Sequence, residues 1–241
     1  MRDHLTFRLY GPLAAWGDIA VGEYRPSFAH PSKSAVIGLL AAGLGIRRDE
    51  EEQQNALAKA CSFAVRVDAM GTLLRDYHTT QVPSARRGVV HYSRRSELVV
   101  GDLNTILSSR DYRCDAAYTV AISVRDGAPY SVQQMADALL RPVFTLYLGR
   151  KSCPLALPLH PCVVSTATLR EALESVPVPL DELVGVMKSP AEVGVYWEDD
   201  EVSGYERDHI TTRRDAPLSR KRWQFAERRE NYTGMRRGGE S

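Results

Sequence analysis

The hydrophobic pattern at the start of this chain changes from a period of two to the period of a helix. Residues 4–10 (His-Leu-Thr-Phe-Arg-Leu-Tyr) alternate with a period of two, which predicts a strand. We expect the Gly11-Pro12 pair to end this strand. A wide apolar stripe over 33–44 then predicts a helix, for which Ser32 is a suitable N-cap. The chain therefore begins with a strand followed by a helix.

Further elements extend this order through the next hundred residues. We predict a short helix over 49–61, strands over 62–68 and 116–125, a helix over 131–140 capped by Ser131, and a strand over 144–148. Apart from the short helix, the order is strand, helix, strand, strand, helix, strand, which is that of a ferredoxin-like (RRM-type) domain. The predicted fold class is α+β.

Two segments do not fit into this domain. Residues 71–114 form a long, arginine-rich insertion, and insertions of this length in compact domains are usually functional. The chain beyond 165 adds a short helix near 168–175, a strand near 192–197 and a basic end. We therefore expect a core domain over 1–70 and 115–165, the insertion over 71–114, and a C-terminal extension over 166–241.

Charge is unevenly distributed, although the formal net charge is only +1. Residues 75–113 contain seven Arg and four acids, 181–202 contain seven acids and one Lys, and 205–241 contain ten Lys or Arg and six acids. Guanidinium groups suit phosphate clamps and base stacking better than ammonium groups do. The pattern favours a nucleic-acid partner; solvated faces without a partner are the alternative.

The remaining composition is typical of a globular protein. Hydrophobic residues make up 44% and no apolar run reaches the ~18 residues of a membrane span, so no membrane partner is expected. The N-terminus has no signal-peptide pattern, which predicts a cytoplasmic protein. No C-x-x-C pair occurs, and no metal or cofactor is expected. Four residues are expected to be buried free thiols: Cys61, Cys114, Cys153 and Cys162.

Common catalytic signatures are missing from the sequence. There is no G-x-S-x-G, no H-E-x-x-H and no pair of histidines at metal-ligand spacing. Ser32-Lys33-Ser34 opens a predicted helix without the glycine of a phosphate loop, which leaves anion contact and plain capping as alternatives. Tyr77 and His78 have the chemistry to act on a ribose 2′-OH as acid and base, but a structural or RNA-stacking role is favoured.

Aromatic and basic residues are interleaved at several places: Tyr77-His78, His91-Tyr92 beside Arg94-Arg95, Arg110 with Tyr112, and Tyr147 before Arg150-Lys151. Single-stranded RNA is held by rings and guanidinium planes that stack on bases, with cations along the phosphates. Gly149 beside two cations lets the backbone approach a phosphate. The set predicts RNA binding, whereas each tyrosine taken alone is explained as a half-buried aromatic.

Four stretches then carry a family resemblance. They are Leu9-Tyr10-Gly11-Pro12 through Ala15-Trp16-Gly17; Arg25-Pro26 through Pro31-Ser32-Lys33-Ser34 to Gly38-Leu39-Leu40 and Leu44-Gly45-Ile46; Arg75-Asp76-Tyr77-His78-Thr79; and Tyr147-Leu148-Gly149-Arg150-Lys151-Ser152-Cys153-Pro154-Leu155. With these motifs the chain resembles the CasD family, the RAMP-type subunit that binds the 5′ handle of the guide RNA (crRNA) in the type I-E CRISPR Cascade complex. The likeness is clearest up to about residue 160.

The resemblance implies a ferredoxin-like palm that grips the handle and a thumb, here 71–114, that separates the handle from the spacer. By position in the motifs, it implies RNA contact for Arg25, Lys33, Tyr77, His78, Arg110, Tyr147, Arg150 and Lys151. The helix start and the glycine add Ser32, Ser34 and Gly149 to this RNA-binding set. No catalytic residue is assigned.

The partners implied are the guide RNA, the backbone subunit CasC, the large subunit CasA and, through the complex, target DNA. Relatives in the type I-C system look to cut repeat RNA with a Tyr and an adjacent Lys-His pair, which this sequence lacks. A subunit that binds without turnover is therefore favoured over a metal-independent endoribonuclease using His78 with Tyr77. A scaffold whose basic patches contact only protein is the third hypothesis.

Overall fold

Strand β1 (Arg2–Ala14) runs past the point where its sequence suggested an end. The structure is a computed structural model that describes residues 1–176, 192–198 and 202–236. Gly11 stays in the ladder opposite Ala116, so the prediction that Gly11-Pro12 ends the strand is wrong. Beyond Thr6 only one edge of β1 faces another strand, and proline is tolerated where a strand has an unpaired edge.

Four antiparallel strands form one part of the sheet in the order β6-β1-β5-β3, with β6 at its edge. Their bounds are Cys61–Ala69 for β3, Leu103–Val124 for β5 and Cys162–Thr166 for β6. The strands predicted at 62–68 and 116–125 are therefore confirmed, although β5 begins much earlier than its apolar run.

The strand predicted over 144–148 is wrong. Tyr147 forms only an isolated bridge with Pro154, and β6 takes the edge position beside β1. Leu146 and Leu148 are nevertheless buried in the core. The apolar alternation in this segment therefore comes from a turn that buries Leu146 and Leu148 in the core, and not from a strand.

Three helices contribute to the core that also contains Phe7 and Phe63 of the sheet. They are α1 (Lys33–Leu44), α2 (Glu51–Ala60) and α4 (Val132–Leu140). The Ser32 side chain accepts a hydrogen bond from the Ala35 amide, and Ser131 forms a capping box with Gln134. Both predicted caps are confirmed, because each satisfies an amide that the first helical turn leaves unpaired.

The opposite face of the sheet has a smaller apolar cluster. Ala64 and Ala121 alternate with residues of the main core, so their side chains point the other way. They pack against Leu169 and Leu173 of α5 (Leu169–Glu174). The predicted helix near 168–175 is confirmed, and it explains why β3 is buried on both faces.

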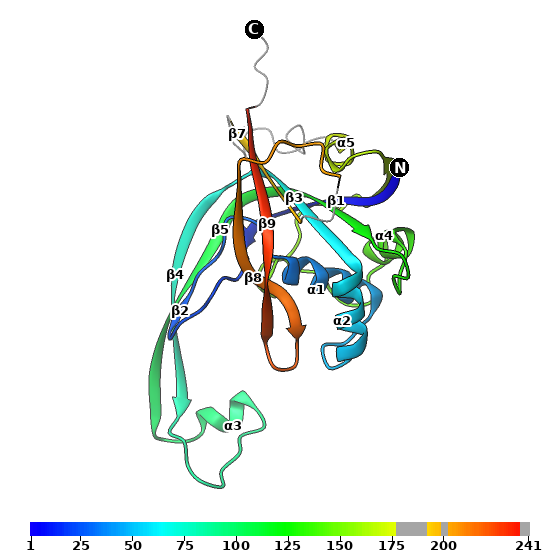
Figure 1. Cartoon of the computed structure of the whole chain (residues 1–241). Coiled ribbons are helices and arrows are strands. Elements are labelled where there is room, and N and C mark those ends of the chain that lie inside the picture. Colours follow the sequence, from blue (N-terminus) through cyan, green and yellow to red (C-terminus); the bar gives the residue numbers. More distant parts are fainter. Residues whose placement is uncertain (177–191, 199–201, 237–241) are drawn as a thin grey trace.

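The sheet continues beyond β3 into a C-terminal hairpin. Strand β7 (Glu192–Trp197) pairs with β3, and β9 (Gln224–Arg236) joins β7 to β8 (His209–Ser219). Strand β8 packs on α1 and α2, and Figure 1 shows the β8–β9 hairpin beside these helices. The strand at 192–197 was predicted, whereas the hairpin was expected only as a basic end.

The insertion over 71–114 is a second hairpin. Strand β4 (Thr72–Pro83) pairs with the first half of β5, α3 (Arg94–Leu98) lies at the tip, and the hairpin projects from the sheet (Figure 1). Near its base, β2 (Tyr24–Arg25) runs parallel to β5. Asp115, with φ 53°, lies where β5 changes partner from β4 to β3, so one continuous strand joins hairpin and core.

The cysteines only partly follow the expectation of burial. Cys61 and Cys153 are buried, Cys114 is intermediate and Cys162 is exposed. The prediction is wrong for Cys162 because it begins an edge strand. Among the described residues no helix is both long and apolar enough to cross a membrane.

Candidate nucleic-acid interface

A large cleft lies between the start of α1, the loop over 15–28, the turn over 144–154 and the β8–β9 hairpin. Its volume is about 2530 Å³. Pockets for small molecules measure roughly 300–1,000 Å³, so this cleft has the size for a segment of a polymer. Seven basic and four acidic residues line it: Arg25, Arg48, Arg150, Lys151, Arg213, Arg214 and Arg220, with Asp18, Asp215, Glu227 and Glu230.

The turn over 144–154 forms one wall of the cleft and depends on Gly149. This residue has φ +82°, and a Cβ there would lie 1.9 Å from the Ala15 carbonyl oxygen. The Ala15 amide also donates to the Leu148 carbonyl at 3.0 Å. Gly149 was predicted to let backbone approach a phosphate, but the approach that the structure contains is to Ala15 of the same chain.

Arg150 ties this wall to the base of the β4–β5 hairpin. Its Nη1 donates to the Asp111 carbonyl at 3.1 Å and its Nη2 to the Arg25 carbonyl at 3.2 Å. The guanidinium also lies 4.7 Å from the centroid of the Tyr112 ring. Arg150 therefore orients three segments around the cleft, while Lys151 is exposed beside it on the cleft lining.

The residues at the start of α1 have different environments. Ser32 and Ser34 line the cleft. Lys33 is 6% exposed, and its Nζ donates to the two Glu198 carboxylate oxygens at 2.8 and 3.0 Å. The expected phosphate contact of Lys33 is therefore wrong, because its ammonium group is buried and neutralised by Glu198.

The three candidates on β4 and β5 do not line the cleft. Tyr77 is 73% exposed, and the His78 Nε2 lies 2.6 Å from the Asp76 Oδ2. Arg110 faces Asp76 across the hairpin and is adjacent to Arg25 of β2. Arg25 belongs to the cleft lining, so the Arg25–Arg110 pair is where the cleft meets the hairpin.

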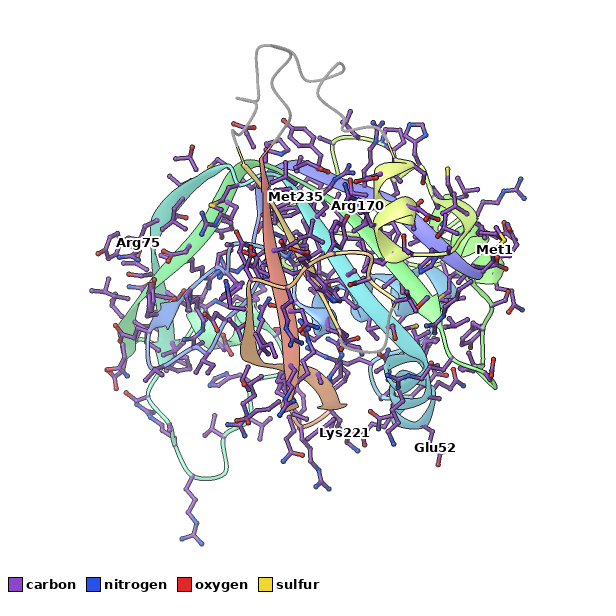
Figure 2. The ribbon with its side chains drawn as sticks, turned by 45° about the horizontal axis from the view of Figure 1, so that its top comes forward. Met1, Glu52, Arg75, Arg170, Lys221 and Met235 are labelled. Carbon is purple, nitrogen blue, oxygen red and sulfur yellow. The ribbon has the colours of Figure 1, made fainter. Side chains whose placement is uncertain are left out.

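A carboxylate organises the base of this hairpin. The Asp111 Oδ1 accepts from the Arg75 Nε at 2.8 Å, and its Oδ2 accepts from the Tyr24 hydroxyl at 2.6 Å. The hydrogen bond from Arg75 holds the pKa of Asp111 below its ordinary value. Figure 2 shows Arg75 at the side of the molecule that this hairpin forms.

Known proteins share the sequence pattern and the fold of this chain. A family model described as CRISPR-associated protein (Cas_Cas5) matches residues 4–230. The chain belongs to the Cas5 family. It is 35% identical over 240 residues to the CRISPR system Cascade subunit CasD of Escherichia coli (strain K12), covering 95% of this chain and 94% of that protein. The predicted resemblance is confirmed.

Two solved structures share the fold of this Cas5-family chain. One is a chain of a CRISPR RNA-guided surveillance complex, with a TM-score of 0.65 and 24% identity over 97% of this chain and 90% of that chain. The other is a crystal structure of a Cas protein, with a TM-score of 0.65 and 29% identity over 97% of this chain and 95% of that chain.

Sequence reasoning missed the wall that the β8–β9 hairpin contributes to the cleft of this Cas5 protein. The hairpin is held by buried charges, in which the Arg228 side chain donates to Asp215 at 2.6 and 3.0 Å and to Glu230 at 2.5 Å. Arg213 lies 3.7 Å from Glu230. Arg213 and Asp215 are two positions apart, which is the spacing of strand residues that point to the same face. A search for apolar residues at this spacing misses them because both are charged.

A histidine beneath the hairpin completes this Cas5 wall. His30 is fully buried, stacks on Tyr196 with centroids 3.8 Å apart, and has its Nε2 3.2 Å from Glu230. Burial lowers the pKa of His30 despite its bond to Glu230. Burial raises the pKa of Glu230, but His30, Arg228 and Arg213 outweigh it and bring that pKa to about 2.

Proposed function

We propose that this chain is a non-catalytic subunit of a CRISPR Cascade complex that binds the 5′ handle of the guide RNA in the cleft and helps to assemble the complex. The observation that carries the proposal is the cleft itself, which joins a basic excess with tyrosine and serine side chains in a chain of the Cas5 family. Its relationship to CasD over nearly the full length of both chains supports the same role.

The RNA-contact set of this proposal follows the cleft and then the hairpin. Ser32, Ser34, Tyr147 and Lys151 line the cleft, and Arg25 connects it to the hairpin. Gly149 and Arg150 shape the cleft wall. Tyr77, His78 and Arg110 belong to the hairpin and would meet the RNA after it leaves the cleft. Lys33 is no longer part of the set.

The domain division is part of the same proposal. The order β6-β1-β5-β3, with α1 after β1 and α4 after β5, supports a ferredoxin-like palm over 1–70 and 115–165. The projecting β4–β5 hairpin would be the thumb over 71–114, and 166–241 the C-terminal extension. The partners would be CasC, CasA and, through the complex, target DNA in the cytoplasm.

Hairpin geometry supports binding without cleavage. Tyr77 and His78 are consecutive residues of a regular strand, and consecutive side chains of a strand point to opposite faces. A general acid and a general base must both reach the reacting groups of one nucleotide within hydrogen-bond distance. The two side chains therefore cannot serve one 2′-OH without a rearrangement of β4. The endoribonuclease remains the alternative function.

Incubation of the purified full chain with repeat RNA tests the proposal. We expect salt-dependent binding, with a log–log slope of about −0.7 for each phosphate contacted, and intact RNA on a denaturing gel. Cleavage that His78→Ala abolishes would establish the endoribonuclease instead. Absence of RNA binding at low salt would support a scaffold that contacts only protein.

A further inference from the structure

The turn of the β8–β9 hairpin inserts an arginine against α1. The Arg220 Nη2 donates to the Ser34 carbonyl oxygen. A Cβ at Gly38 would lie 3.2 Å from the same Nη2, so the glycine provides the space in which the guanidinium lies. Figure 2 shows the adjacent Lys221 at the end of the hairpin, on the outside of the molecule. Arg220 instead belongs to the cleft lining.

Half-buried Arg220 differs from Arg213 and Arg228 of the same hairpin, whose guanidiniums lie beside carboxylates. Within the described ranges no acidic oxygen lies within 4.0 Å of Arg220 or of Arg48, and the buried Arg220 Nε has no hydrogen-bond partner. Burial and the nearby charge of Arg48 lower the pKa of Arg220 to about 10, so the group stays charged at neutral pH. A half-buried cation without a counter-ion among the described residues loses part of its hydration, and an anion in the cleft would offset that cost.

An aromatic ring lies beside these two cations. The Arg48 guanidinium covers the Trp223 ring with its Cζ 3.9 Å from the centroid, and Trp223 is still 58% exposed. Its backbone has φ 53°, a conformation that is costly for a bulky residue. Arg48, Arg220 and Trp223 all line the cleft, together with Tyr147. The turn therefore presents an exposed indole next to two cations that have no acidic partner in the part of the chain that the structure describes.

We propose that Arg48, Arg220 and Trp223 form a nucleotide subsite of the cleft, where the two guanidiniums bind a phosphate and the indole stacks on an unpaired base. The inference rests on the proposed function and adds one residue from the loop after α1 and two from the turn of the β8–β9 hairpin. A free phosphate or a sulfate would use only the cations. The adjacent exposed ring favours single-stranded RNA, because bases stack on aromatic side chains whatever their sequence.

Tryptophan fluorescence gives a direct readout for the indole. The chain has three tryptophans, of which Trp16 is 1% and Trp197 is 4% exposed. Quenching on titration with handle RNA should therefore report Trp223. We expect quenching in the wild type and its loss in Trp223→Phe, with Trp223→Ala lowering affinity roughly five- to hundredfold. Quenching that persists in Trp223→Phe would overturn the subsite.

The cations are tested by a matched pair in one turn. Arg220→Gln removes the cleft guanidinium, and Arg222→Gln removes an exposed one that is not part of the cleft lining. We expect Arg220→Gln to reduce the log–log salt slope by about 0.7, with Arg222→Gln close to wild type. Equal effects of the two substitutions would show that Arg220 contributes only general positive charge, and would overturn the subsite. Arg48→Gln, at an exposed position, gives a second variant if Arg220→Gln does not fold.

Anisotropy of labelled handle RNA with the wild-type chain separates the two proposals. Wild-type binding with no quenching, and with no difference between the Arg220 and Arg222 variants, would overturn the subsite and leave the proposed function standing. Absence of wild-type binding would overturn both. Inorganic phosphate should compete weakly and cause no quenching; quenching by phosphate alone would contradict base stacking.

Discussion

The two hairpins of this protein are both rich in arginine, but they use it differently. In β8–β9, the Arg213 and Arg228 side chains are 8% and 7% exposed and lie among Asp215, Glu230 and Glu198. In the β4–β5 hairpin, most side chains of β4 and of the loop over 84–102 are exposed. One hairpin is a wall held by internal ion pairs, whereas the other is an arm whose charges face solvent except at its base, where Asp111 is buried.

The difference shows that the partner of an arginine, rather than the local charge density, decides its role. Arg228 is surrounded by carboxylates and holds two strands together. Arg220, in the same hairpin, has no acidic partner among the described residues and lies in the cleft. The amino-acid composition of the C-terminal segment does not distinguish these two arginines.

The largest expected effect comes from the buried network of the β8–β9 wall. Arg228→Met should lower the free energy of unfolding by about 3–5 kcal/mol, because Asp215 and Glu230 stay buried with less compensation. Urea denaturation followed by circular dichroism measures the loss. Arg229→Met, at the exposed neighbouring position, is the control and should change stability by less than about 0.5 kcal/mol. Similar losses in both variants would show that the network is not what stabilises the wall.

Acid should weaken the same wall by a smaller amount. Burial lowers the pKa of His30 in the folded state, so below about pH 6.5 the unfolded chain binds a proton that the folded chain does not. Stability should therefore fall as the pH drops below about 6.5, and fall further between 4.5 and about 2 as Glu230 is protonated.

Melting temperatures measured from pH 7.5 to 5 check the sign of this effect. His30→Gln should flatten the dependence between pH 6.5 and 5, whereas His91→Gln, in the exposed hairpin, should retain it. A wild-type stability that rises on acidification in this range would contradict the assignment of His30 as a buried neutral group.

The arm should be less sensitive, because its ion pairs are fewer and lie nearer to solvent. Asp111→Asn should cost about 1–3 kcal/mol, since Arg75 and Tyr24 lose an ionised acceptor. Asp126→Asn, in an exposed turn, serves as the control in the same denaturation experiment. A loss as large as that of Arg228→Met would remove the distinction between wall and arm.

The smallest expected effect concerns the exposed Lys151. Lys151→Ala should leave stability unchanged and reduce the log–log salt slope of handle binding by about 0.7, which corresponds to one phosphate. Filter binding at several salt concentrations measures the slope. An unchanged slope would exclude Lys151 from the interface.

The sequence predicted those parts of the fold that depend on apolar periodicity and on caps. Apolar residues recur at every second position in 4–10 and 62–68, and Ser32 and Ser131 mark the starts of α1 and α4. The β8–β9 hairpin was not predicted, because its inward positions are occupied by charged residues that become buried only in ion pairs. Local sequence does not reveal which distant carboxylates will meet them.

The candidate site was predictable at its centre and not at its edges. The turn that contains Tyr147 and Lys151 was singled out, and both residues line the cleft. Lys33 was assigned to phosphate because nothing near it in sequence indicates Glu198, which reaches it across 165 positions. Trp223 was missed because its neighbour Arg48 belongs to a different region of the chain.

Photocrosslinking of handle RNA to the full chain, followed by mass spectrometry of the attached peptides, tests the central claim most directly. We predict crosslinks in the turn over 144–154 and in β8–β9 near Trp223, on the two walls of the cleft, with additional ones in β4–β5. Crosslinks confined to α4 and α5, with none on the cleft walls, would contradict the account.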